Sequence, residues 1–250
     1  MTSVSGYSLI KAPCCGAAYT TPKYASINLT AKEYWSDGHK EAALYVEDGG
    51  LRKCSCGGFY LLRDATRPEQ EPEPDTPPAQ RLEPEDLLQA IQSTSKPIEL
   101  WARRLYWRHL NQGYRAAYRA RIDAVDQGGN RPGGRSGSRS RWTELVGRAL
   151  RLKKSEPPSG PAEPVSFPAY EPSATQIANM ERLIELIQQG GHEVQAPDMV
   201  EVAELYRELG LFEQARGAMA RASHDRTRLP MKLITDMITK EQRAPFRYSL

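Results

Sequence analysis

The four cysteines of this chain are the residues whose type and spacing most clearly predict chemistry. Cys14 and Cys15 are adjacent, Cys54 and Cys56 are separated by one serine, and a glycine follows each cluster. Groups of four thiolates are preferred ligands of structural zinc, and glycine permits the tight turn that presents backbone N–H groups to sulfur. The sequence therefore predicts that the two turns meet and that Cys14, Cys15, Cys54 and Cys56 bind one structural zinc ion.

The short spacing within each cluster leaves three other interpretations open. Zinc knuckles normally separate their cysteines by two residues, which is more than either cluster provides. Three of the cysteines could bind metal together with His39, the cysteines could be buried as small apolar residues, or a disulfide could join the clusters. In the zinc interpretation the four protein ligands leave no open coordination position, so the predicted zinc is structural and not catalytic.

Short segments rich in β-branched and aromatic residues surround the cysteines. The segments YSLI, ASINL, ALYV and FYLL are separated by turn-forming residues and predict a β-rich module over residues 1–63. The rest of the chain has mainly helical spacing. The expected fold class is α+β, with a small zinc-ribbon-like β module followed by a mainly α-helical middle and a C-terminal helical hairpin region.

Three strings in this module carry a resemblance: KAPCCGAAY, YASINLTAKEYWSDG and LRKCSCGGFYLLRDA. They resemble an uncharacterised group of bacterial proteins with an N-terminal zinc-ribbon-like module, marked by a Trp-Ser-Asp-Gly element between two cysteine pairs. The resemblance covers about the first quarter of the chain and implies no activity. From the residues alone, we expect Trp35 to pack on the small sheet and Asp37 and Gly38 to form a turn.

Two proline-rich segments divide the rest of the chain. Residues 64–84 combine prolines with acids and have few apolar side chains, which predicts an extended acidic linker. Residues 156–172 predict a second linker. Between them lies a basic segment, 85–155, with a mobile Gly/Arg/Ser-rich loop predicted at 128–140 and a short basic helix predicted over 142–154.

The basic segment interleaves aromatic residues with arginines. Apolar spacing over 97–126 predicts one or two amphipathic helices, with Gly113 as a weak point. Arginine contacts phosphate and aromatic rings stack on bases, so this segment could bind RNA or single-stranded DNA. The same pattern fits a helix whose aromatics face a core and whose arginines face water or the acidic linker. The candidate nucleic-acid contacts are Arg103, Arg104, Arg108, Arg115, Arg119 and Arg121.

The last segment, 173–250, predicts a helical module. Ser173 is a candidate cap for its first helix, and three further helices are expected between residues 197 and 240. The run AELYRELGLFEQARGAMARAS resembles one tetratricopeptide repeat, in which small residues let two helices approach closely. A single repeat cannot bury its own face, so the neighbouring helices are expected to cap it, and an ordinary helical hairpin remains an alternative.

The sequence contains no motif that predicts catalysis. It has no phosphate-binding glycine loop, nucleophile elbow or HExxH element, and its four histidines are far apart. It also has no secretory signal or long apolar run, which predicts a cytoplasmic protein that does not enter a membrane. We therefore expect a non-enzymatic zinc-binding adaptor with a protein partner and no small-molecule substrate, and nucleic-acid binding is the alternative.

Overall fold

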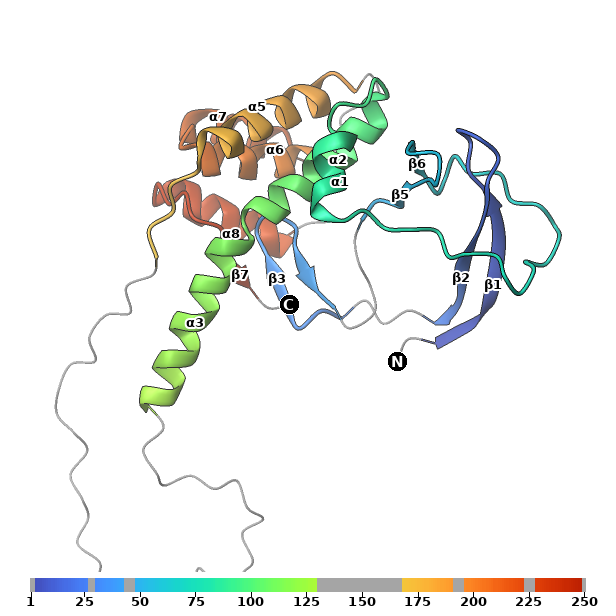
Figure 1. The fold of residues 1–250 in the computed structure, drawn as a ribbon. Helices are drawn as coiled ribbons and strands as arrows, with labels where there is room; N and C mark the ends of the chain where they lie inside the picture. Colours follow the sequence, from blue (N-terminus) through green and yellow to red (C-terminus); the bar gives the residue numbers. More distant parts are fainter. Residues whose placement is uncertain are drawn as a thin grey trace, which may run out of the picture. The chain divides into compact units, whose positions relative to one another are not determined.

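The computed structural model describes residues 3–26, 30–42, 48–129, 168–190, 196–222 and 228–248. The β hairpins lie in the N-terminal part and the helices follow (Figure 1), which confirms the α+β fold class. The chain divides into two compact units, one formed by Met1–Gly113 with Tyr170–Leu250 and the other by Tyr114–Ala169. Most of the loop predicted at 128–140, the helix at 142–154 and most of the second linker lie outside the described residues.

The secondary-structure elements keep their chain-order labels. The strands are β1 (Ser3–Lys11), β2 (Ala18–Ser26), β3 (Glu33–Trp35), β4 (Lys40–Glu41), β5 (Leu51–Lys53), β6 (Phe59–Leu61) and β7 (Arg247–Tyr248). The helices are α1 (Pro84–Ala90), α2 (Lys96–Leu110), α3 (Gln112–Gly129), α5 (Ala174–Gln188), α6 (Ala196–Leu209), α7 (Phe212–Arg221) and α8 (Arg228–Thr239). The one or two helices expected over 97–126 are two, α2 and α3. They divide at Asn111, and the predicted weak point Gly113 lies within α3.

Strands β1 and β2 form a long antiparallel ribbon. Ile10 and Tyr19 lie opposite each other at its inner end, and both are buried. Strand β2 begins earlier than the predicted strand ASINL and contains Pro22, which pairs with Tyr7. Proline is tolerated in an edge strand, so pairing with β1 outweighs its poor strand propensity. The predicted strand ALYV lies outside the described residues.

The hairpin of β5 and β6 joins two small hydrophobic cores. Because side chains alternate along a strand, Leu51 and Leu61 face one way and Tyr60 the other. Leu51 and Leu61 pack with residues of α1 and α2, while Tyr60 packs with Ile10 and Tyr19 of the ribbon. This hairpin therefore connects the ribbon to the first two helices.

Residues 64–83 form no helix or named strand, but they are attached to the hairpins. Isolated β-bridges join Thr66 to Lys11, Pro78 to Thr20 and Gln80 to Lys53. Proline has no N–H to donate, yet its carbonyl still accepts, and the Thr20 N–H donates to the carbonyl of Pro77 at 2.8 Å. The acidic segment therefore packs along the β module and is not a detached linker.

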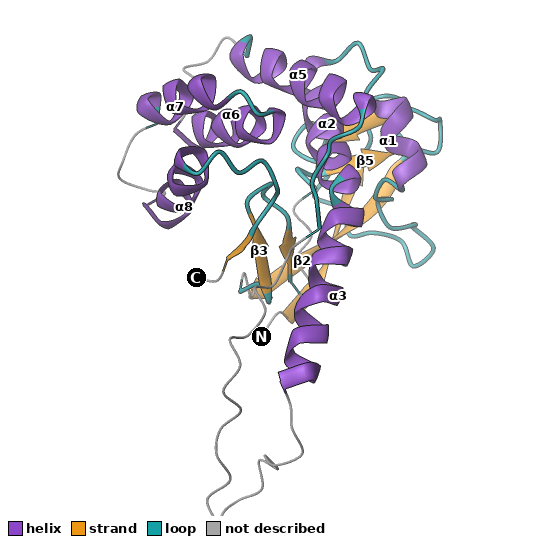
Figure 2. Ribbon diagram, turned by 90° about the vertical axis from the view of Figure 1, so that its left-hand side faces the viewer, coloured by secondary structure: helices purple, strands orange, loops and turns teal. Residues whose placement is uncertain are grey.

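The Trp-Ser-Asp-Gly element occupies a different place from the one expected. Its turn forms as predicted, with the Gly38 N–H donating to the carbonyl of Trp35 at 3.0 Å. However, Trp35 lies in β3, which pairs with β4 and with the C-terminal strand β7. Figure 2 shows β3 beside this C-terminal strand, below α8. The fully buried Trp35 side chain therefore packs at the C-terminal region of the first unit and not in the core of the cysteine-bearing hairpins.

Helices α5 to α8 form the largest hydrophobic core, which also includes Trp107 of α2. The predicted cap at Ser173 is confirmed, because its hydroxyl accepts the Gln176 N–H while the Gln176 side chain accepts the Ser173 N–H. Helices α6 and α7 form a hairpin around Gly210, as the sequence predicts. Small residues of α7, Ala215 and Ala218, are fully buried and permit the close approach of the two helices.

Gly49 gives a stability prediction for the contact between the β5 turn and α2. A Cβ atom at Gly49 would lie 2.1 Å from Cδ2 of Trp101, and Gly49 has a φ of +62°. We expect Gly49→Ala to lower the free energy of unfolding by about 3 kcal/mol, from overpacking and backbone strain together. Gly16 has a φ of +76° but no neighbour within 4 Å, so Gly16→Ala should cost only about 1 kcal/mol. Equal decreases in the free energy of unfolding for the two variants, measured by urea denaturation, would contradict the predicted clash at Gly49.

Candidate metal centre

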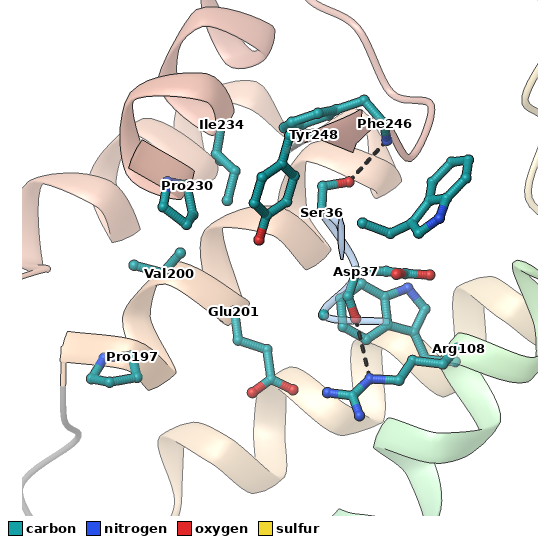
Figure 3. A pocket seen from close by; sticks show the side chains of 13 residues that line it. Ser36, Asp37, Arg108, Pro197, Val200, Glu201, Pro230, Ile234, Phe246 and Tyr248 are labelled. Carbon is teal, nitrogen blue, oxygen red and sulfur yellow. Dashed lines mark hydrogen bonds between the residues drawn. The ribbon is translucent and has the colours of Figure 1, made fainter. Parts of the chain in front are cut away.

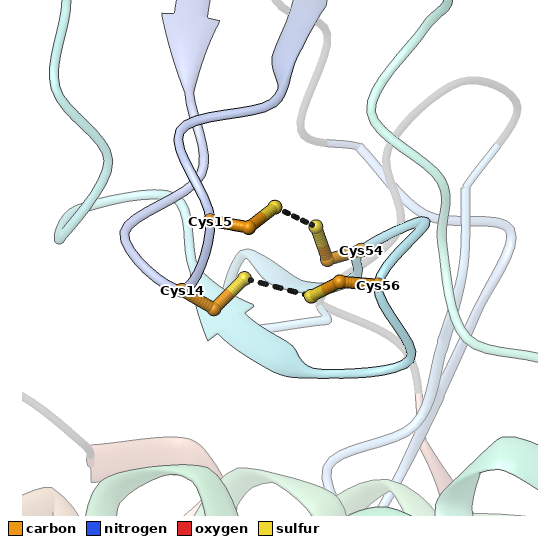
Figure 4. A group of neighbouring side chains, drawn as sticks. All are labelled: Cys14, Cys15, Cys54 and Cys56. Atoms are coloured by element: carbon orange, nitrogen blue, oxygen red, sulfur yellow. Dashed lines mark hydrogen bonds between the residues drawn. The ribbon is translucent and has the colours of Figure 1, made fainter.

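The two cysteine clusters meet, as the sequence predicts (Figure 4). The four Sγ atoms lie within 4.8 Å of one another. The shortest separations are 3.3 Å between Cys15 and Cys54 and 3.5 Å between Cys14 and Cys56. Zinc binds thiolate sulfur at about 2.3 Å, which places neighbouring sulfurs of a tetrahedron about 3.8 Å apart. The group therefore fits one tetrahedral metal ion such as zinc with only small adjustments.

The turns that carry the cysteines are held by backbone hydrogen bonds. In the first turn the Gly16 N–H donates to the carbonyl of Ala12 at 2.8 Å. In the second turn the Cys54 N–H donates to the carbonyl of Gly58 at 2.8 Å, and the Gly57 N–H donates to the carbonyl of Cys54 at 2.9 Å. Gly16 and Gly57 both have positive φ, which explains why glycine follows each cluster.

This arrangement explains how such short spacings can serve one site. The sulfurs make contacts between the clusters, because Cys15 Sγ contacts Cys54 Sγ and Cys14 Sγ contacts Cys56 Sγ (Figure 4). Each turn therefore contributes two sulfurs to a shared centre, and neither turn has to coordinate an ion with its own two cysteines alone.

The geometry narrows the three alternative interpretations. The sulfurs are too far apart for disulfide bonds, whose length is about 2.05 Å, and all four cysteines are free. Cys14, Cys15 and Cys56 are exposed and only Cys54 is buried, so the cysteines are not core residues as a set. Among the described residues the group contains the four cysteines without His39.

The buried thiol of Cys54 has a lowered pKa. Burial acts to raise its pKa, but hydrogen bonds from the Cys56 backbone N–H, Tyr19 and the neighbouring thiols outweigh burial and lower the pKa to about 6. Cys14 behaves oppositely, because burial and the contacts with Cys54 and Cys56 raise its pKa to about 12. One thiolate is thus available near neutral pH, and a bound cation would favour ionisation of the others.

Tyr19 supports this centre, although the sequence pattern did not single it out. Its hydroxyl lies 3.4 Å from Cys54 Sγ, accepts the Ser55 N–H at 2.7 Å and donates to Ser55 Oγ at 3.0 Å. Its ring stacks on Tyr60 with the centroids 6.2 Å apart. The available signal was the position of Tyr19 in the string CCGAAY, directly after the first cysteine turn.

A second group of polar side chains is buried away from the cysteines. Glu208 accepts hydrogen bonds from Trp107 Nε1 at 2.9 Å, Asn111 Nδ2 at 3.1 Å and the Tyr170 hydroxyl at 2.7 Å. Asn111 Nδ2 also donates to Asp37 Oδ2 at 3.2 Å. Burial, together with the nearby carboxylates of Glu204 and Asp37, raises the pKa of Glu208 to about 8. Glu208, Asn111 and Asp37 are almost fully buried, so this network fastens the Asp37 turn to α2 and α6.

The candidate nucleic-acid contacts are not gathered on one surface of α2. Arg103 pairs with Glu99 at 2.8 Å, and Arg104 pairs with Glu201 at 2.8 Å and with Asp198 at 3.2 Å. Arg108 donates to the backbone carbonyl of Asp37 at 3.3 Å. The remaining three candidates are in α3 and belong to the second compact unit: Arg115, Arg119 and Arg121.

Taken together, the fold and the site define a mixed α+β chain whose N-terminal hairpins carry a four-cysteine cluster suited to metal. No family model, curated protein or solved structure matches the chain. In the part of the chain that the structure describes, no helix has the length and apolar character needed to span a membrane.

Proposed function

We propose that this chain is a cytoplasmic, non-enzymatic adaptor in which a structural zinc ion stabilises the N-terminal hairpins for interaction with a protein partner. The convergence of the four cysteine sulfurs within 4.8 Å carries the proposal. Four thiolate ligands would complete the tetrahedron of one zinc ion, so no coordination position would remain for a substrate. Cys14, Cys15, Cys54 and Cys56 would hold the ion, and its role would be to fasten the two turns.

The small size of the hairpin cores supports a structural role for metal. The core around Cys54 contains six buried residues, and β5 and β6 have three residues each. Isolated two-stranded hairpins are at best marginally stable in water, and small domains commonly need a metal or disulfides. The reduced cysteines are the only such crosslink that the described residues offer.

The outer half of the β1–β2 ribbon supports the interaction part of the proposal. Val4, Tyr7 and Tyr24 are 48%, 57% and 39% exposed. The pairs Val4–Tyr24 and Tyr7–Pro22 lie directly opposite each other, so the register places these side chains on one face. Residues 3–26 contain two lysines and no acids. A protein partner with an apolar and acidic surface would complement this face.

Metal analysis of the purified full-length protein tests the zinc part of the proposal. We expect about one zinc ion per chain after gentle purification, because all four ligands come from the same chain. A zinc or iron content below about half an equivalent would count against a structural metal site.

A binding titration separates the adaptor from the nucleic-acid alternative. We expect a fluorescent single-stranded oligonucleotide to bind weakly and with little salt dependence, because Arg103 and Arg104 are engaged with carboxylates of the first unit. The measurement is fluorescence anisotropy at two salt concentrations. A steep slope, corresponding to several phosphate contacts, would favour the nucleic-acid function instead.

A further inference from the structure

A cavity of about 170 Å³ lies where the Trp-Ser-Asp-Gly turn meets the C-terminal helices (Figure 3). Five segments of the chain line it: the turn itself, α2, α6, α8, and the C-terminal segment that contains β7. All of these segments belong to the first compact unit. The cavity is separate from the cysteine cluster, since no cysteine lines it.

The walls of the cavity are mainly apolar. Figure 3 shows Val200, Ile234 and Pro230 on one side and the Tyr248 ring beside them, to the right. Three charged side chains also line the cavity: Asp37, Arg108 and Glu201. The Asp37 carboxylate accepts hydrogen bonds from the His39 N–H at 3.0 Å and from Asn111 Nδ2 at 3.2 Å. Glu201 is held by Arg104 at 2.8 Å, and Arg108 donates to the carbonyl of Asp37 at 3.3 Å. Because these charges are already engaged within the protein, the cavity best suits a neutral, apolar group.

The cavity is held open by rigid side chains. Trp35 and Trp107 are 0% and 2% exposed. Each indole is fixed by a hydrogen bond, from Trp35 Nε1 to Glu33 at 3.1 Å and from Trp107 Nε1 to Glu208 at 2.9 Å. Fixed walls reduce the cost of ordering the site when a ligand enters.

The volume limits what can enter. Sites for drug-sized ligands and cofactors usually occupy about 300–1,000 Å³, so this cavity is too small for them. It suits a single large side chain, and such anchor residues in preformed pockets dominate many protein–protein interfaces.

We propose that this cavity receives one bulky apolar side chain, of the leucine or phenylalanine class, from a protein partner. This inference rests on the proposed adaptor function and names the kind of residue through which the adaptor would recognise its partner. It also gives the Trp-Ser-Asp-Gly element a role, because its turn forms one wall of the recognition pocket.

The test uses capped amino acids as probes of the full-length, metal-loaded protein. N-acetyl-L-leucinamide and N-acetyl-L-phenylalaninamide are titrated while the indole N–H signals are followed by NMR. We expect saturable shifts of the Trp35 and Trp107 signals, with dissociation constants on the order of millimolar for ligands of this size. The Trp101 signal should stay unchanged, because Trp101 does not line the cavity. The absence of saturable shifts would overturn the proposal.

Substitutions of Val200, a residue in the wall of the cavity, test whether the probe binds in the cavity. We expect Val200→Phe, which fills the cavity, to weaken probe binding at least about tenfold, since the probe and the new ring would occupy the same space. Val200→Ala, which cannot clash, should weaken it about threefold through lost apolar contact. Leu211→Phe is the matched control, because Leu211 is 39% exposed and lies outside the cavity, and its affinity should equal that of the wild type. Unchanged affinity in both Val200 variants would show that the probe binds elsewhere.

Two further readouts separate the possible failures. Uncapped L-leucine should bind less tightly than the capped probe, and tighter binding would instead indicate a free amino-acid site. Zinc content is measured on the same samples. If the protein binds the probe but never contains zinc, the proposed zinc-dependent function is wrong and the proposed pocket stands. If the protein contains zinc but binds no probe, only the proposal of a side-chain pocket is wrong.

Discussion

Removal of the proposed zinc ion with a chelator is expected to unfold the two cysteine-bearing hairpins while helices α5 to α8 remain folded. Structural zinc in small domains contributes about 10–16 kcal/mol of binding free energy, which is far more than a core of a few side chains supplies. The core of α5 to α8 contains no cysteine, so we expect it to stay folded without the metal. In amide hydrogen exchange, Ile10 and Tyr60 should therefore lose protection, and Leu183 and Val202 should keep it.

Single-residue variants test whether the sulfurs cause this effect. Cys54→Ser removes the one buried ligand and should abolish metal binding and hairpin protection together. Ser55 lies between the two cysteines of the same turn. The Ser55→Ala variant loses no sulfur, so it should still bind the metal. Hairpin amides that stay protected in metal-free protein would show that the two small cores suffice and that the metal is not structural.

The second large effect is expected at Arg207, which is buried in α6. Arg207 is 0% exposed and forms an ion pair with Glu204, with Nε donating to Oε2 at 2.8 Å. It also donates to the backbone carbonyl of Gln242 and lies over the ring of Phe246. Removing one partner of a buried pair leaves an uncompensated charge, so Arg207→Ala should lower the free energy of unfolding by about 3–5 kcal/mol.

Arg216 supplies a matched control within the next helix. It pairs with Glu213 at the same i,i+3 spacing, but both side chains are solvent-exposed. Water and salt screen such a pair, so Arg216→Ala should leave the free energy of unfolding close to the wild-type value. Urea denaturation of the two variants makes the comparison. Similar decreases in the free energy of unfolding for the two variants would indicate that burial does not determine how much the Glu204–Arg207 pair contributes to stability.

Local signals predicted much of the first unit from the sequence. Turn-forming glycines after each cysteine cluster indicated two turns, and hydrophobic periodicity with the Ser173 cap indicated the C-terminal helices. These features depend on residues a few positions apart, so the sequence displays them directly. The meeting of the two clusters was also predicted, because structural zinc prefers four thiolate ligands and each cluster supplies two. The metal itself and the partner remain predictions.

Only the tertiary structure decided where the Trp-Ser-Asp-Gly turn and the chain end lie. The Ser36 N–H donates to the carbonyl of Phe246, and the Phe246 N–H donates to the Ser36 hydroxyl. These two residues are 210 positions apart in the sequence. The strands that bring them together have three and two residues, which is too short for a recognisable hydrophobic period. The buried network of Glu208 and Asn111 depends on the same long-range packing. The sequence by itself determined the turns, caps and helix faces, whereas contacts between distant short segments arose only when the whole core formed, because no local pattern encodes them.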